Sequence, residues 1–258
     1  MGKTRMGKII AVANQKGGVG KTTTAVSLAC SLNDLGCRTL LVDFDPQGNA
    51  TSGMGVGKQV APTIYEALLG GVDAARVVVE TRFGPLLPAN KSLSGAEIEL
   101  VDMGNRERLL ANALLPIRDS YRFVLIDCPP SLGLLPLNAL CAADTILVPV
   151  QCEYFALEGL SDLMYTVRAV RNGLNPSLDV EGVLLTMFDG RTNLSGQVAA
   201  EVKRFFPGKL YATVIPRNVR LSEAPSHGMP VQHYDKWSRG AEAYTKLAQE
   251  IIRKNKKL

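Results

Sequence analysis

The sequence predicts a doubly wound α/β fold, in which helices cover both faces of a mostly parallel sheet. Two observations support this prediction. Six short runs along the chain are almost continuously apolar, which is typical of strands covered on both faces. Stretches with helical spacing of apolar residues separate these runs, so strand and helix alternate throughout. No linker or internal repeat divides the chain, and residues 1–258 are expected to form a single domain, with residues 1–7 as a flexible N-terminal extension.

The expected elements follow from these patterns. The clearest helix is Thr22–Leu35, whose apolar residues share one face, and Gly36 stands where a C-cap belongs. Residues 53–95, rich in glycine and proline, give no clear assignment. The other expected helices are Gly159–Arg171, Leu194–Phe205 and Ser238–Arg253. The expected strands are Lys8–Asn14, Arg38–Asp43, Tyr121–Asp127, Asp144–Val150, Val180–Phe188 and Leu210–Ile215.

Composition excludes several classes of protein. With 46% hydrophobic and 21% charged residues, the chain is neither disordered nor a coiled coil. No stretch offers the roughly 18 uninterrupted apolar residues of a membrane span. The basic N-terminus lacks the long apolar run and the cleavage site of a signal peptide, so a cytoplasmic protein is expected. The 5 cysteines are scattered without a Cys-x-x-Cys pair, and neither a disulfide framework nor a zinc site is expected.

Charge is distributed unevenly along the chain. The 29 Lys and Arg against 24 Asp and Glu give a net charge of +5. Residues 203–258 alone carry 12 basic against 4 acidic side chains, so the basic excess lies in the last fifth of the chain. Such a segment favours a polyanionic partner, although a solvated basic face has the same composition.

A glycine-rich loop follows the first predicted strand. Its sequence from Gln15 is QKGGVGKTT, and a predicted helix comes directly after it. Gly17, Gly18 and Gly20 allow a tight turn whose backbone N–H groups converge on phosphate oxygens, and the helix adds its N-terminal dipole. The loop is therefore expected to bind a nucleotide through residues 16–23: Lys16, Gly17, Gly18, Val19, Gly20, Lys21, Thr22 and Thr23.

Two residues of this loop have the roles of an ordinary phosphate loop. Lys21 would lie on the β- and γ-phosphates, and the hydroxyl of Thr22 would ligate Mg²⁺. The loop departs from the ordinary pattern at its start, because Gln15 stands where the leading glycine belongs. Lys16 has no role in the ordinary pattern. It either neutralises the nucleotide of its own chain or reaches that of a neighbour.

Aspartates end two of the predicted strands. Asp127 follows four apolar residues of one strand, and Asp43 and Asp45 end another. Ligands of open α/β sheets bind at the carboxyl ends of the strands, so these side chains point toward the site. Asp127 is interpreted as the Walker B aspartate, which holds Mg²⁺ through its water shell. Together with Lys21 and Thr22, Asp45 and Asp127 provide what transfer of a phosphoryl group to water requires.

The signature from Lys16 to Thr22 resembles that of the deviant-Walker ATPases, the ParA/MinD group, which reads KGGxGK[ST]. The resemblance implies a P-loop NTPase that hydrolyses ATP to ADP with Mg²⁺. It implies that Lys16 crosses a nucleotide-sandwich dimer to the phosphates of the partner, that Asp45 orients the attacking water near Mg²⁺, and that Asp43 supports it. Lys16, Lys21 and Asp45 are thus the implied catalytic residues, and Thr22, Asp45 and Asp127 the metal site.

Longer segments resemble the chromosomal ParA (Soj) branch of that group. In this branch, Pro216, Arg217 and Asn218 frame the purine, and positions matching Arg191 and Arg220 bind DNA. The resemblance implies an ATP-dependent DNA segregation protein that dimerises on ATP, binds double-stranded DNA without sequence preference and is released when a ParB-type centromere-binding partner stimulates hydrolysis. It would lie on the nucleoid, away from membranes. The segments are 43–53, 126–133, 149–160, 182–198 and 215–231.

Two other functions fit parts of the sequence. A MinD-like, membrane-cycling regulator of division-site placement needs a C-terminal amphipathic anchor, and the basic end Ile251–Leu258 has too few apolar residues for one. An iron–sulfur reductase resembling the nitrogenase iron protein needs cluster cysteines well beyond the Walker B strand, whereas Cys128 adjoins Asp127. The partition ATPase is therefore preferred.

Overall fold

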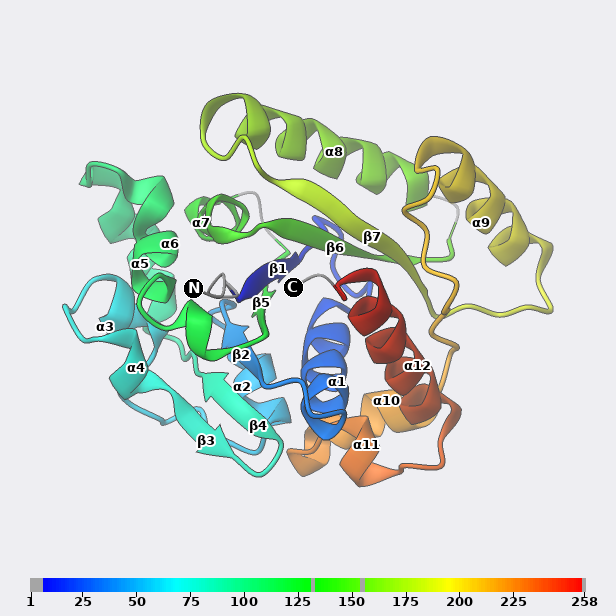
Figure 1. Ribbon diagram of the computed structural model, residues 1–258, viewed down its shortest axis with the longest axis horizontal. Coiled ribbons are helices and arrows are strands. Elements are labelled where there is room, and N and C mark those ends of the chain that lie inside the picture. The colour runs from blue at the N-terminus through cyan, green and yellow to red at the C-terminus, as the bar shows by residue number, and fades with distance from the viewer. Residues whose placement is uncertain (1–6, 131–132, 154–155, 257–258) are drawn as a thin grey trace.

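One seven-stranded sheet forms the centre of the computed structural model, which describes residues 7–130, 133–153 and 156–256 (Figure 1). The strand order is β3-β4-β2-β5-β1-β6-β7, and every neighbouring pair is parallel except β3 and β4. The predicted doubly wound, mostly parallel fold is confirmed. The strands are β1 (Lys8–Val12), β2 (Thr39–Asp43), β3 (Val79–Thr81), β4 (Gly84–Leu87), β5 (Phe123–Asp127), β6 (Thr145–Gln151) and β7 (Asp179–Thr186).

Helices cover both faces of this sheet (Figure 1). Every residue of β2 and β5 is buried, because apolar side chains leave these strands toward two separate hydrophobic clusters. One cluster includes side chains of α5, α6, α7 and α9, and the other packs α1, α11 and α12 against the opposite face. The helices are α1 (Lys21–Asp34), α2 (Asn49–Gly53), α3 (Ile64–Leu68), α4 (Ala74–Val77), α5 (Leu93–Glu99), α6 (Leu109–Leu114), α7 (Leu134–Ala142), α8 (Ala156–Gly173), α9 (Asn193–Phe205), α10 (Val219–Glu223), α11 (Val231–Tyr234) and α12 (Arg239–Lys254).

Most predicted elements are confirmed, with ends displaced by at most three residues. Helix α1 ends as expected, since Gly36 has a φ of 74°. The unassigned stretch 53–95 contains helices of four or five residues and the short strands β3 and β4. Elements this short do not repeat an apolar pattern often enough to be recognised in a sequence.

The predicted strand Leu210–Ile215 is wrong. Leu210 forms an isolated bridge to Val183 of β7, and Pro216 forms another to Phe188 just after β7, without a regular ladder between them. The amides of Ala212 and Thr213 instead donate to the Glu250 carboxylate of α12, at 3.0 and 3.1 Å. A side chain distant in sequence therefore replaces the ladder that local β propensity predicts.

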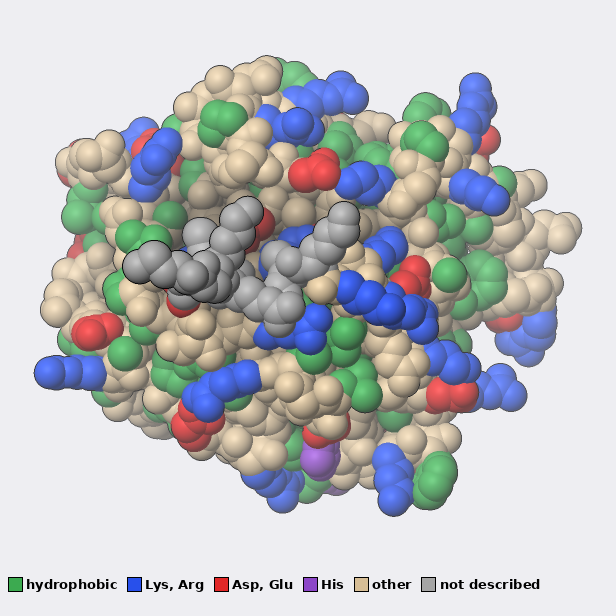
Figure 2. Space-filling view, viewed as in Figure 1, with side chains coloured by type: hydrophobic (Ala, Val, Ile, Leu, Met, Phe, Trp, Pro, Cys, Tyr) green, Lys and Arg blue, Asp and Glu red, His purple; other side chains and the backbone are tan. Residues whose placement is uncertain are grey.

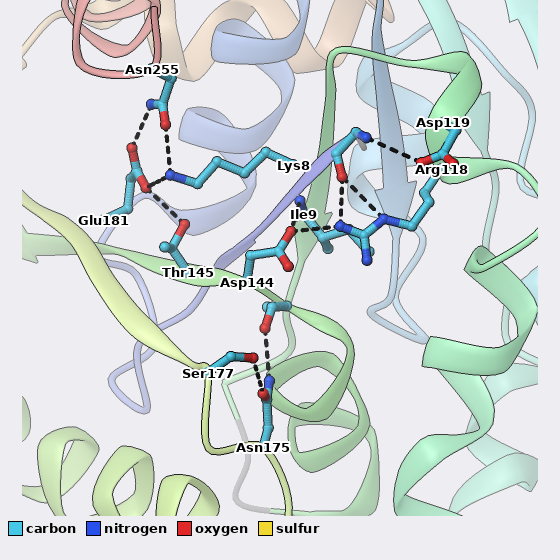
Figure 3. Close-up of polar contacts among 12 residues, drawn as sticks. Lys8, Ile9, Arg118, Asp119, Asp144, Thr145, Asn175, Ser177, Glu181 and Asn255 are labelled. Atoms are coloured by element: carbon cyan, nitrogen blue, oxygen red, sulfur yellow. Dashed lines mark hydrogen bonds and ion pairs between the residues drawn. The ribbon is translucent and has the colours of Figure 1, made fainter. Parts of the chain in front are cut away.

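Hydrogen bonds and ion pairs of polar side chains hold both ends of the described chain at the amino edge of the sheet (Figure 3). The Arg118 guanidinium donates to the carbonyl of Gly7 and pairs with Asp144. Lys8 pairs with buried Glu181, which also accepts a hydrogen bond from Asn255 just after α12. The rest of the predicted N-terminal extension, residues 1–6, lies outside the described residues. These contacts leave the opposite, carboxyl edge of the sheet for the site.

Candidate nucleotide-binding site

The loop between β1 and α1 has the backbone that its glycines predict. Gly18 and Gly20 have φ values of 75° and 88°, which L side chains rarely adopt, and Gly20 directly precedes the helix. The carbonyl of Val19, whose side chain is buried, accepts a hydrogen bond of 2.8 Å from the hydroxyl of Thr186 on β7. The loop is thus attached to a strand two positions away in the sheet.

Lys21 is the first residue of α1, and its side chain folds back over the loop. Its ammonium donates to the carbonyl of Lys16 at 3.0 Å and is largely buried. Burial lowers the pKa of Lys21, while the negative charge of Asp127 opposes that shift. A cation held in this position is ready to neutralise phosphate oxygens at the N-terminus of the helix.

The strand order brings the predicted aspartates together. β5 lies between β2 and β1, and Asp43 is in register with Asp127 across the ladder. Asp43 is buried and accepts two hydrogen bonds of 2.7 Å from Thr51, which fix its carboxylate. Burial raises the pKa of Asp43 to about 6. Asp45 is near enough for its charge to act on both Lys21 and Asp127.

Asp127 is the least satisfied polar group of the site. Both carboxylate oxygens are buried and neither meets the distance and angle of a regular hydrogen bond among the described residues, although the Thr22 hydroxyl is near enough to lower the pKa of the carboxyl. Burial, and next the negative charge of Asp43, raise the pKa of Asp127 well above its ordinary value. A buried carboxylate of this kind is costly unless a cation accompanies it. Carboxylate oxygens beside the Thr22 hydroxyl suit Mg²⁺, so the residues present fit the metal.

A cavity of about 440 Å³ extends from the loop to the C-terminal third of the chain. Pro216, Arg217 and Asn218 line it together with Gly20 and Thr23 of the phosphate loop, so the structure brings together two predicted groups almost 200 residues apart. Asn218 also caps α10, because its Oδ1 accepts from the amide of Arg220 at 2.9 Å. A cavity that begins at a phosphate loop and is flanked by a proline can take a purine base.

Lys16 does not point at the loop of its own chain. Its ammonium lies 3.0 Å from a carboxylate oxygen of Glu153, just after β6, and both side chains are partly exposed. The backbone of Lys16 is held separately, since its amide donates to Asn14. Lys16 is therefore placed beside the phosphate site without filling it.

Comparisons with known proteins agree with this geometry. A model of the AAA domain family matches residues 7–180. The chain is 57% identical over 249 residues to the sporulation initiation inhibitor protein Soj of Bacillus subtilis, covering 95% of this chain and 98% of that protein. It is 52% identical over 257 residues to the chromosome partitioning protein ParA of Myxococcus xanthus, covering 98% and 91%. The chain belongs to the ParA/Soj family of chromosome-partitioning ATPases.

A solved structure supports the nucleotide assignment for this ParA/Soj-family chain. Cobyrinic acid a,c-diamide synthase from Mycobacterium smegmatis, with bound ADP and magnesium, has a TM-score of 0.85 and 39% identity, over 97% of this chain and 96% of that one. The chain is an ATPase that binds ATP and ADP with Mg²⁺. No helix within the described residues is both long and apolar enough to cross a membrane.

The two arginines expected to bind DNA both have acidic partners in this ParA/Soj-family chain. Arg191 follows β7, is almost fully exposed, and pairs with Asp189 at 2.7 Å. That pairing holds the pKa of Asp189 at about 2. Arg220 belongs to the helix α10 and pairs with Glu223 at 2.8 Å and Asp235 at 3.2 Å. Phosphate must therefore compete with these carboxylates.

Sequence reasoning assigned no role to three residues that shape the site. Asn14 donates to the Pro149 carbonyl and accepts from the loop, and Glu153 pairs with Lys16. Met187 lines the cavity with a φ of 51°, a strained backbone that is often found at functional sites. Glu153 and Met187 lie inside the segments that resemble the Soj branch, which was the available signal.

Proposed function

We propose that the chain is a DNA-partitioning ATPase that dimerises on ATP, binds DNA through phosphates, and is released by hydrolysis. The observation that carries this proposal is the position of Lys16. Its ammonium is partly exposed beside the phosphate site, while Lys21 occupies the loop. A second cation at the rim suits the phosphates of a nucleotide bound to a second copy.

Nucleotide binding follows from the loop and its flanking elements. The backbone N–H groups of residues 17–21 surround the β-phosphate, and Lys21 compensates the charge of the terminal phosphates. Thr22 and Asp127 would hold Mg²⁺, with Asp127 acting through water. Bound Mg²⁺ neutralises charge that develops on the phosphate oxygens. Pro216 and Asn218 flank the purine in the cavity.

Hydrolysis depends on placing water at the terminal phosphate. Asp45 lies close to Lys21 and Asp127, and its own Oδ1 is turned by a hydrogen bond of 2.9 Å from the amide of Gln47. We infer that Asp45 orients water at the terminal phosphate rather than binding the loop. Positioning and electrostatics account for most of the catalysis in such reactions, and no base of raised pKa is needed.

DNA binding is proposed for the surface that carries Arg191 and Arg220. The loop before Arg191 is joined to the segment before α10 by hydrogen bonds between Phe188, Ile215 and Arg217. In Figure 2, Lys and Arg side chains are spread over the visible face and are more numerous on the half that contains α9, α10 and α12, with acidic side chains among them. A dimer doubles these contacts, so binding is expected to be stronger with ATP and without sequence preference. A ParB-type partner would stimulate hydrolysis and thereby release the protein from DNA.

The C-terminal helix argues for the nucleoid over the membrane. α12 packs against α1 through its apolar side chains, and the described part of the helix therefore has no free apolar face for a bilayer. The side chains concerned are Ala241, Tyr244, Leu247, Ala248 and Ile251.

The proposal is tested by measuring binding to double-stranded DNA with ADP, with ATP and with a non-hydrolysable ATP analogue, across a salt series. Affinity should be highest with the analogue, fall steeply with salt and be equal on unrelated sequences. Equal affinity with ADP and ATP would contradict gating by the dimer. Binding to anionic vesicles in place of DNA would favour the MinD-like alternative.

A further inference from the structure

Three side chains of metal-ligating types meet near the C-terminal end of α1, whereas the phosphate loop precedes its N-terminal end. Cys30 and Asp34 are four residues apart on α1, so they share one face of the helix, and His233 reaches them from α11. The Cys30 sulfur lies 3.7 Å from one oxygen of Asp34, and Nε2 of His233 lies 3.6 Å from the other. All three ligand atoms are within 4.8 Å of one another.

These separations are close to those of a tetrahedral zinc site. With a Zn–S distance of about 2.3 Å and Zn–N and Zn–O distances of about 2.0–2.2 Å, ligand atoms at tetrahedral angles are roughly 3.3–3.6 Å apart. The sulfur–oxygen and nitrogen–oxygen distances here involve different oxygens of Asp34, and all three ligand atoms lie within 4.8 Å of one another. Side-chain movements of roughly 1 Å would therefore bring them around one ion. Asp34 and His233 are partly exposed, which leaves a route for the ion and a fourth position for water.

Neighbouring contacts hold the two helices in place. Gln232, next to His233, donates to the carbonyl of Ser27 at 3.0 Å and to the hydroxyl of Ser31 at 2.8 Å, both on α1. The His233 ring also contacts Phe83, with ring centroids 4.9 Å apart. The three donors are thus presented by elements that are already packed together, as a preformed site requires.

We propose that Cys30, Asp34 and His233 bind one Zn²⁺ ion, or a divalent transition-metal ion of similar preference, and so link α1 to α11. Thiolate, imidazole and carboxylate together favour zinc over the Mg²⁺ of the nucleotide site. As the metal–sulfur bond forms, the thiol proton leaves to solvent and no oxidation state changes. The sequence pattern hides this site, because its histidine is about 200 residues from its cysteine.

Cobalt provides the test, because Co²⁺ bound to a thiolate gives a charge-transfer band that oxygen-bound Co²⁺ lacks. Metal-free full-length protein is titrated with Co²⁺ under excess Mg²⁺ and without nucleotide. One equivalent should produce the band, and Zn²⁺ should remove it. Absence of the band in the wild-type protein would overturn the proposal.

Variants assign the ligands. Cys30→Ser should abolish the band, and His233→Gln should weaken binding by more than about 100-fold, since even outer-shell partners of metal ligands contribute about 10–100-fold. His227→Gln and Cys141→Ser are matched controls outside the cluster and should bind as wild type. His233 is partly exposed, so its variant should fold, which circular dichroism checks. A folded His233→Gln with wild-type affinity, or a band that is lost only in Cys128→Ser, would refute the site.

Discussion

Lys16 and Glu153 form an ion pair of 3.0 Å at the rim of the phosphate loop, between the segment after β1 and the segment after β6. Within one chain, this pair engages the Lys16 ammonium, which is proposed to reach the nucleotide of a partner. Dimerisation would then have to break it. Both side chains are partly exposed, so the pair contributes at most about 1 kcal/mol. An interaction this weak can be exchanged for a phosphate contact.

Removing the carboxylate should therefore favour the ATP dimer slightly. Glu153→Gln is expected to tighten dimerisation with a non-hydrolysable analogue by up to about fivefold per pair, because Lys16 no longer exchanges partners. Lys16→Ala should retain nucleotide but stay monomeric. Analytical ultracentrifugation measures both. Glu80→Gln, which breaks the exposed pair with Arg38, is the matched control. Normal dimerisation of Lys16→Ala would exclude the role across the interface.

Asp45→Ala should separate binding from hydrolysis. The substitution leaves the loop and Lys21 intact, so ATP affinity should change little. Turnover should fall by about 100-fold or more, the usual scale for losing a group that acts on the attacking water. Equilibrium binding of a fluorescent ATP analogue and steady-state phosphate release measure the two quantities. Lys21→Ala is the contrasting variant and should lose nucleotide binding itself. An equal loss of affinity and turnover in Asp45→Ala would make Asp45 a binding residue.

Asp127→Asn should stabilise the protein without nucleotide. Burial raises the pKa of Asp127 and of Asp43 above their unfolded values, so each favours folding below its unfolded pKa and loses that contribution as pH rises through its folded pKa. Near neutral pH the variant should exceed wild type by about 1–3 kcal/mol, because the amide that replaces the carboxyl carries no charge to desolvate.

Thermal and urea unfolding in the absence of Mg²⁺ at several pH values measure this difference for Asp127→Asn. The advantage should shrink as pH falls toward 4, because the wild-type carboxyls then become neutral. Binding of Mg²⁺ and nucleotide should weaken in the same variant. A variant that is less stable than wild type at neutral pH would show that Asp127 has a stabilising partner in the folded chain.

The carboxylates beside Arg220 should restrain DNA binding. Glu223→Gln removes its closest acidic partner, so affinity for DNA at low salt should rise, while Arg220→Ala should lower affinity equally on every sequence. If both copies in a dimer contact phosphate, Arg220→Ala should flatten the slope of log affinity against log salt by about 1.8. Fluorescence anisotropy across a salt series gives both values. Glu242→Gln, which breaks a similar pair with Lys246, is the control. Wild-type behaviour of Arg220→Ala would place the DNA surface elsewhere.

Local sequence patterns predicted five of the seven strands, the phosphate loop and the aspartates at the ends of two strands. Apolar runs and helical spacing are local properties, and glycines at Gly18 and Gly20 specify a local backbone. Asp43 and Asp127 end parallel strands, so they lie at the carboxyl edge of the sheet whatever the order of the strands. The resemblance to the Soj branch supplied the remaining site residues.

The tertiary structure decided what depends on contacts between distant segments. The Glu250 carboxylate of α12 accepts hydrogen bonds from the amides of Ala212 and Thr213, where the sixth strand was predicted. No local sequence pattern predicts this contact. The partner of Lys16, the cavity that joins Gly20 to Pro216, and the meeting of Cys30 with His233 all require the chain to return to the same place. Periodicity specifies which face of an element is buried, and only packing specifies which side chain lies opposite it.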